Sequence, residues 1–170
     1  DSGLSITEWD PVMGAIPPLN AAAWQAAFAA YQTTAEFAVQ NAAMSLAEFK
    51  VIFWWEWGHR QLGRFIGLTW ALGLALLFVT GKLPKARRLP LLAIGPFIGL
   101  QGFIGWLMVH SGLDGVRLDV ASYWLMAHLG AAFALLGYIF WLVQIFSRSE
   151  AELLQARRAR ERKLFGMSTG

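Results

Sequence analysis

The stretch Phe53-Trp-Trp-Glu-Trp-Gly-His-Arg-Gln-Leu-Gly-Arg64 puts a carboxylate, a histidine and two arginines into a segment that is otherwise apolar and aromatic. In a helix, the polar and small residues of this stretch and of the turn after it share one face: Glu56, His59, Arg60, Gly63, Arg64 and Gly67. Ionisable groups within an apolar helix are costly, and they usually mark a functional face or hold a cofactor. The stretch therefore predicts a membrane helix with one functional side.

The composition also predicts a membrane protein. The chain has 170 residues, of which 56% are hydrophobic, with nine Trp and twelve Phe. A helix that spans a bilayer needs about 20 mostly apolar residues. The windows that meet this length are Val51–Thr80, Leu89–His110 and Ala121–Phe146. We therefore expect an all-α membrane protein with three transmembrane helices.

The distribution of charge predicts the orientation of these spans. Residues 1–50 carry five acidic side chains and a single basic one, Lys50, whereas residues 81–88 and 147–170 are rich in Lys and Arg. Under the positive-inside rule the basic segments face the cytoplasm and residues 1–50 face outward. Because the charge of the tail follows from topology, anionic lipid is favoured as its partner, and no nucleic acid is expected.

Two further features of the sequence concern the chemistry that the protein can use and whether the sequence is part of a longer protein. There is no cysteine, which excludes a disulfide, a thiolate-bound haem and an iron–sulfur cluster. The chain starts without Met or a secretory signal. Because an outward N-terminus requires a preceding span or a cleaved signal, we expect the sequence to be part of a longer protein.

Short amphipathic helices are expected in the outer region, on the membrane surface or over the bundle. Asn20 is a candidate N-cap for a helix that runs to about Gln32, with a packing stripe of Trp24, Phe28 and Tyr31. Two capping boxes are predicted, from Thr33 with Glu36 and from Ser45 with Glu48.

Glycines in the second window suggest that its helix packs closely against a neighbouring helix, and glycines after the window suggest a turn. Gly95-x-x-x-Gly99 favours tight helix packing, although it would equally leave space for a flat macrocycle. Gly112 and Gly115 predict a tight outer turn.

The depths of two histidines point to a haem. His59 lies about eight residues into the first window and His128 about seven into the third, and both windows run inward. At about 1.5 Å per residue, both imidazoles would lie roughly 10–12 Å below the outer surface. Such a pair predicts bis-histidine ligation of one iron, whereas each histidine alone would be a hydrogen-bonded bundle residue. His110 ends the second window and is expected to be interfacial.

The charged neighbours of His59 leave several roles open. Glu56 is a candidate hydrogen-bond partner of His59, a candidate proton acceptor for substrate chemistry, or an ion-pair partner of Arg60. Arg60 and Arg64 suit haem propionates, and structural ion pairing is equally favoured.

Several strings of the chain resemble haem A synthase. They occur in the order expected for that family: Ser2-Gly-Leu-Ser-Ile-Thr-Glu-Trp-Asp-Pro-Val12, Ile52-Phe-Trp-Trp-Glu-Trp-Gly-His-Arg60, Gln101-Gly-Phe-Ile-Gly-Trp106 and Ala127-His-Leu129. The absence of cysteine is similar to the proteobacterial and mitochondrial branch. The resemblance implies that this sequence is the N-terminal half of the protein without its first helix. It would then contain three helices of a four-helix half-bundle, and a second half would lie outside this sequence.

The resemblance also implies a function. Family members oxidise the C8 methyl of haem O to a formyl group, and the product haem A serves terminal oxidases. By motif, His59 and His128 are the ligand pair of this half, and Glu56 is the catalytic carboxylate. Trp124 departs from the family, which usually has Arg at this place. The alternatives are a non-enzymatic b-type cytochrome segment and a scaffold for oxidase assembly.

The expected organisation follows from these points. Residues 1–50 form a periplasmic loop with amphipathic helices, 51–146 a haem-binding bundle in the inner membrane, and 147–170 a basic cytoplasmic segment. The implied cofactor is haem b, with haem O as substrate. The implied partners are the bilayer, an electron donor such as a ferredoxin, haem O synthase and the assembling oxidase.

Overall fold

The computed structural model describes residues 4–8, 13–112 and 118–168. Its elements, in chain order, are a 3-10 helix η1 (Met13–Ala15) and the α-helices α1 (Ala21–Gln32), α2 (Ala35–Gln40), α3 (Leu46–Val79), α4 (Lys85–Gly112), α5 (Ser122–Phe146) and α6 (Glu150–Ser168). No strand occurs among these described residues. The predicted turn residue Gly115 lies outside them.

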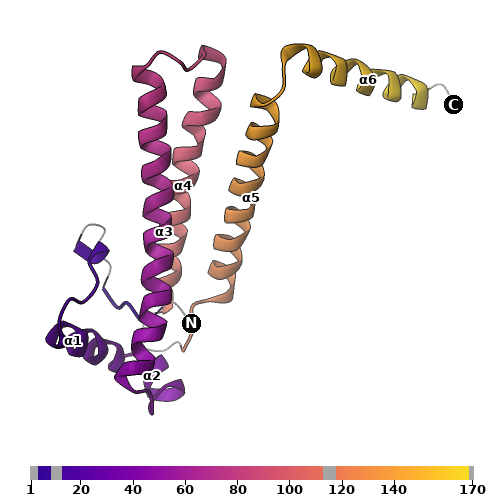
Figure 1. The fold of residues 1–170 in the computed structure, drawn as a ribbon. Coiled ribbons are helices and arrows are strands. Elements are labelled where there is room, and N and C mark those ends of the chain that lie inside the picture. The colour runs from indigo at the N-terminus through magenta and orange to yellow at the C-terminus, as the bar shows by residue number, and fades with distance from the viewer. Residues whose placement is uncertain (1–3, 9–12, 113–117, 169–170) are drawn as a thin grey trace. The chain divides into compact units, whose positions relative to one another are not determined.

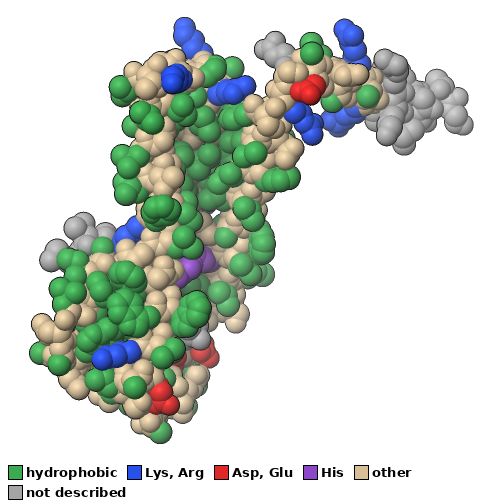
Figure 2. All heavy atoms as spheres, viewed as in Figure 1, with side chains coloured by type: hydrophobic (Ala, Val, Ile, Leu, Met, Phe, Trp, Pro, Cys, Tyr) green, Lys and Arg blue, Asp and Glu red, His purple; other side chains and the backbone are tan. Residues whose placement is uncertain are grey.

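Three of the helices, α3, α4 and α5, are long and apolar enough to cross a membrane. Large apolar side chains project outward along them, for example Leu72, Phe103 and Phe140, and many hydrophobic side chains are visible along the long helices in Figure 2. Exposed apolar surface of this extent requires a lipid environment or a partner. The prediction of an all-α membrane protein with three spans is confirmed.

Two helix boundaries differ from the predicted windows. The helix α3 begins at Leu46 because the capping box of Ser45 and Glu48 forms as predicted. The helix α4 begins at Lys85, before the predicted start, and contains Pro90 and Pro96. An interior proline removes one N–H from the helical ladder and its ring crowds the carbonyl four residues earlier, yet the helix continues through both prolines. The basic residues before Pro90 are therefore helical although they are not apolar.

One predicted capping box is wrong. The N-cap of α2 is Thr34, whose hydroxyl accepts a hydrogen bond from the amide of Phe37. The preceding Thr33 instead caps the end of α1, and its hydroxyl donates to the carbonyl of Ala30 at 2.7 Å. With two adjacent threonines between the helices, the first one is used by the helix that ends there.

The chain divides into two units, residues 1–132 and 133–170. In the first unit α3 and α4 lie side by side (Figure 1), joined by a turn in which Gly81 has φ 67°. The indole N–H of Trp70 donates to the carbonyl of Leu91 at 2.8 Å, and a Cβ at Gly95 would overlap the same indole ring. Gly95 therefore serves helix packing, whereas nothing lies within 4 Å of a Cβ at Gly99.

The helices α1 and α2 pack on the beginning of α3. Phe28, Tyr31, Phe49 and Phe53 form a buried cluster, so the stripe predicted on α1 packs as expected. The Tyr31 hydroxyl accepts a hydrogen bond from the side chain of Asn41 at 2.7 Å. Burial raises the pKa of the Tyr31 phenol above its ordinary value, and the phenol therefore remains neutral at physiological pH.

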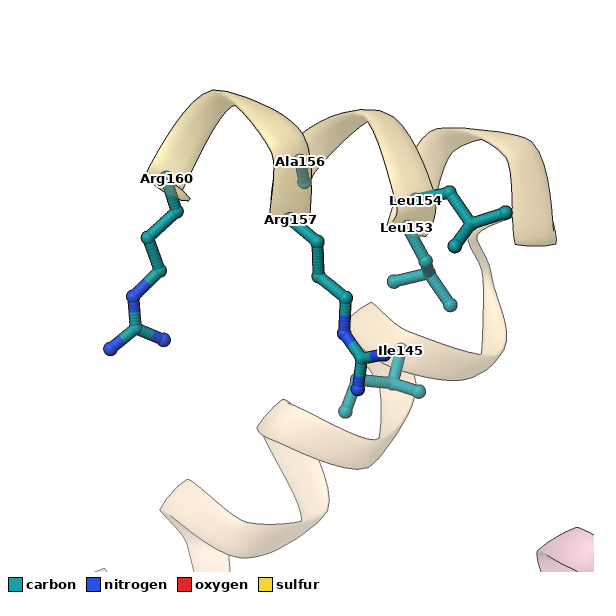
Figure 3. Close-up of a pocket in the computed structure, with 6 residues that line it drawn as sticks. All are labelled: Ile145, Leu153, Leu154, Ala156, Arg157 and Arg160. Atoms are coloured by element: carbon teal, nitrogen blue, oxygen red, sulfur yellow. The ribbon is translucent and has the colours of Figure 1, made fainter. Parts of the chain in front are cut away.

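The second unit contains the later part of α5 and the basic helix α6. The helix α6 begins with a reciprocal cap, in which the Ser149 amide donates to Glu152 at 2.7 Å and the Glu152 amide donates to Ser149 at 3.3 Å. A shallow hollow between the end of α5 and α6 is shown in Figure 3, and its lining residues are Ile145, Leu153, Leu154, Ala156, Arg157 and Arg160. The basic segment after the last span is thus helical over Glu150–Ser168.

Candidate functional site

Two imidazoles face each other within the first unit. His59 on α3 and His128 on α5 have ring centres 6.2 Å apart, with ring planes at 69°. Two imidazoles that bind one metal from opposite sides, at about 2.0–2.1 Å from metal to nitrogen and about 1.1 Å from nitrogen to ring centre, have ring centres roughly 6 Å apart. The structure thus brings the two predicted histidines together at a spacing that suits a shared metal, and their ligation of one iron stays a prediction.

The surroundings of His128 suit a bound group. Its Nδ1 is buried and has no hydrogen-bond partner among the described residues, and buried polar atoms in folded proteins are normally paired. The carbonyl of His128 accepts a hydrogen bond from the side-chain amide of Gln101 at 2.9 Å. A Cβ at Gly105 would lie 3.1 Å from Cε1 of His128. The lack of a side chain at Gly105 thus makes room for the imidazole.

The ligand set fits a haem better than a bare metal ion. In the described part of the chain, no three side chains of His, Cys, Asp or Glu come together to hold a metal. Two facing imidazoles supply only the axial ligands of an iron whose other four ligands are porphyrin nitrogens. The residues present therefore fit an axially ligated haem.

A buried carboxylate lies one helical turn before His59. Glu56 is 6% exposed, and its oxygens accept hydrogen bonds from the Ser5 hydroxyl at 2.5 Å, the Ile6 amide at 3.2 Å and the Arg60 guanidinium at 2.5 Å. Within the described residues, no hydrogen bond joins Glu56 to His59. Of the roles left open by the sequence, the geometry shows the ion pair with Arg60.

The two arginines differ in their surroundings. Arg60 donates both to Glu56 and, at 3.3 Å, to the carbonyl of Ile6, so its guanidinium bridges α3 and the N-terminal segment. Arg64 is half-buried one turn further along the helix. In this structure structural bridging describes Arg60, and the propionate role predicted for the arginines stays a prediction.

Two other residues singled out in the sequence lie at the edge of the site. His110 is exposed near the end of α4, where its ring stacks on Trp106 with centres 5.2 Å apart; its interfacial position stays a prediction. Trp124 is half-buried in the first turn of α5, one turn before His128. The hollow in Figure 3 contains none of the candidate site residues.

Sequence reasoning did not single out three residues as parts of the site. Ser5 and Ile6 reach Glu56 across 51 and 50 residues, and Gln101 reaches His128 across 27. No local pattern predicts contacts over such separations. The available signal was their presence in strings that resemble a family, which marked the segments without giving the residues a role.

Comparison with known proteins gives a consistent result. A family model described as "COX15-CtaA: Cytochrome oxidase assembly protein" matches residues 1–170. A protein of Paracoccus denitrificans named "Heme A synthase" is 57% identical over 169 residues, which are 99% of this chain and 44% of that protein. Proteins of the same name from Jannaschia sp. and Cereibacter sphaeroides are 56% and 55% identical, and the chain covers 45% and 43% of their lengths. The chain thus spans less than half the length of these curated relatives. No solved structure matches it.

Proposed function

The chain belongs to the COX15-CtaA family of cytochrome oxidase assembly proteins, and we propose that it is the haem-binding N-terminal half of a haem A synthase. The reaction is the oxidation of the C8 methyl of haem O to a formyl group. The observation that carries the proposal is the facing pair of His59 and His128, with rings 6.2 Å apart on two apolar helices. The names of the relatives support the activity.

We assign the substrate haem O to this histidine pair and the resident haem b to the second half expected in the complete protein. The reason is the position of Glu56, one helical turn from His59. A carboxylate that acts on a methyl group must lie beside the porphyrin being oxidised. When bound, the haem supplies the iron-centred redox chemistry of the reaction.

The residues of this chain then have distinct tasks. His59 and His128 would hold the haem through nitrogens of their imidazole rings. Glu56 accepts protons released as the methyl carbon is oxidised, or stabilises positive charge at that carbon. Glu56 is only 6% exposed and Phe53, one helical turn before it, is also buried, so little water reaches the carboxylate. Limited access of water strengthens the electrostatic effect of the carboxylate.

The orientation and partners follow from charge and chemistry. We propose that residues 1–50 lie in the periplasm, residues 51–146 in the inner membrane and residues 147–170 in the cytoplasm. Basic side chains of α6, such as Arg157 and Arg160, then lie beside anionic lipid headgroups. Oxidation of a methyl to a formyl group removes electrons from carbon and therefore requires an oxidant. Where dioxygen is that oxidant, an electron donor such as a ferredoxin reduces its second oxygen atom to water. The reaction also requires a supply of haem O from its synthase. The product passes to the assembling oxidase.

The test is haem extraction and chromatography after the full-length protein is expressed together with a haem O producer. The expected result is haem A from the parent protein, and at least a 10²-fold slower conversion in Glu56→Gln with haem still bound, the usual scale for a lost general base. Haem O unchanged in the parent, with a normal bis-histidine spectrum, would instead identify an electron-relaying b-type cytochrome.

A further inference from the structure

A short N-terminal segment, residues 4–8, lies against α3 at the level of Glu56; we name this segment the strap. Leu4 and Ser5 are 1% and 2% exposed, which is unusual burial for residues outside regular secondary structure. The Ser5 hydroxyl and the Ile6 amide both donate to the same carboxylate oxygen, Oε2 of Glu56. Among the described residues, the strap thus supplies two donors to this carboxylate, and Arg60 supplies another at Oε1.

The strap is itself fixed at both of its sides. A Cβ at Gly112, at the end of α4, would lie 3.2 Å from Cδ2 of Leu4, so Leu4 packs closely on this glycine. Arg60 donates to the carbonyl of Ile6 at 3.3 Å. Further along the chain, the carbonyl of Ala15 accepts hydrogen bonds from the side chains of Trp57 and Gln61, at 3.2 and 3.1 Å. Leu4 and Ile6 of the strap are thus each held by a contact to a helix.

These contacts restrict a side chain that would otherwise be mobile. A glutamate has three rotatable side-chain bonds, and a single ion pair one helical turn away constrains it weakly. Donors that approach Oε2 from the strap and Oε1 from the helix hold the carboxylate in one plane. A group that must meet one carbon of a bound porphyrin benefits from such a fixed direction, since small displacements slow catalysis strongly.

Ser5 differs from the other two partners of Glu56 in its hydrogen-bonding chemistry. The Ile6 amide and the Arg60 guanidinium only donate, whereas a serine hydroxyl both donates and accepts. The hydroxyl of Ser5 also lies 3.4 Å from the carbonyl of Ile52. When Glu56 is ionised, Ser5 donates to it. When Glu56 carries a proton, the carboxylic acid donates to Ser5, whose own hydrogen turns to Ile52. The position of the carboxyl group is maintained in both states.

We propose that Ser5 is the positioning residue of Glu56, holding its carboxyl group in one place while that group takes up and releases a proton. This inference rests on the proposed role of Glu56 in oxidation of the methyl group. Ser5 itself touches neither substrate nor iron in the proposal. The strap accordingly has a part in the reaction beyond covering the outer end of the bundle.

The experiment compares Ser5→Ala, Ser5→Thr and Glu56→Gln with the double variant, in the full-length protein with haem O supplied. We expect Ser5→Ala to lower kcat at least tenfold, to leave KM for haem O within twofold, and to keep the bis-histidine spectrum. Ser5→Thr retains a hydroxyl and should recover kcat to within threefold of the parent. In the Glu56→Gln background, Ser5→Ala should change kcat less than twofold, because residues that act as a unit are not additive.

The matched control is Ser111→Ala. Ser111 is near the end of α4, and its hydroxyl donates to the carbonyl of Met108 in the same helix, at 2.9 Å. This variant should match the parent in kcat and spectrum.

The outcomes separate the two proposals. If Glu56→Gln converts haem O at the parent rate, the role of Glu56 fails and this inference fails with it. If Glu56→Gln is slow and Ser5→Ala is as fast as the parent, only the inference about Ser5 is overturned. Losses that multiply in the double variant, or loss of the bis-histidine spectrum in Ser5→Ala, would show that Ser5 only stabilises the fold, and would also overturn it.

Discussion

Replacement of Gly105 by alanine should weaken haem binding through a single methyl group. The Cβ of the alanine would lie 3.1 Å from Cε1 and 3.5 Å from Nδ1 of His128. Carbon atoms in contact normally lie about 3.5–4.0 Å apart. The imidazole must therefore move by roughly 0.3 Å or more to relieve the contact, and the movement displaces a ring that we propose as an axial ligand.

The size of the effect follows from the cost of overpacking. Extra methyl groups in a well-packed site cost about 1–3 kcal/mol. Without haem the ring can turn away, whereas bound iron fixes it in place, so most of the cost falls on the bound state. At 1.4 kcal/mol per factor of ten, the haem affinity should fall by about fivefold to a hundredfold. The higher helix propensity of alanine, about 0.8–1 kcal/mol, acts on both states and cancels.

Gly102 provides the control, because it lies three residues earlier on α4 and nothing is within 4 Å of its Cβ position. The apoproteins of Gly105→Ala, Gly102→Ala and the parent would be titrated with haem in detergent, with the low-spin absorption as the signal. Gly102→Ala should match the parent. Equal affinities of the two alanine variants would refute the reasoning, since they would show that His128 does not hold the haem from its observed position.

Three further predictions concern the ligands, the topology and the helix packing. Alanine at His59 or at His128 should each remove the same low-spin haem signal, and an unchanged spectrum in both variants would contradict shared ligation. The sequence has no cysteine, so single cysteines can be introduced at Ala22 and Ala86. They should react with an impermeant reagent from opposite sides of the membrane, and labelling of both from one side would contradict the orientation. Gly95→Ala should lower the free energy of unfolding by about 1–3 kcal/mol, because the added methyl group overlaps an indole ring, and thermal unfolding in detergent measures this.

Much of the fold could be predicted because its determinants are local. A run of apolar residues specifies a span, and a serine three residues before a glutamate specifies a helix start, as Ser45 and Glu48 show. The failed assignment of Thr33 has the same origin, since two adjacent threonines offer equivalent local signals and only the packing of α1 against α2 decides between them. The pairing of His59 with His128 was accessible to sequence reasoning because helix rise converts residue number into depth.

The environment of Glu56 could not be predicted in this way, and the reason is physical. Spacing along α3 identified Arg60 as one partner of Glu56, and the structure contains that ion pair. The other two donors come from a strap without helical or strand periodicity, about fifty residues away in the sequence. A buried carboxylate requires several hydrogen bonds, and one helix can supply few of them because its own amides are already paired. A buried Glu56 therefore needs hydrogen-bond donors from outside its helix. The sequence predicts this need, but it does not identify the donors. A buried glutamate in a membrane helix should therefore prompt a search for an irregular segment with free amides and hydroxyls, which here is the strap with Ser5 and Ile6.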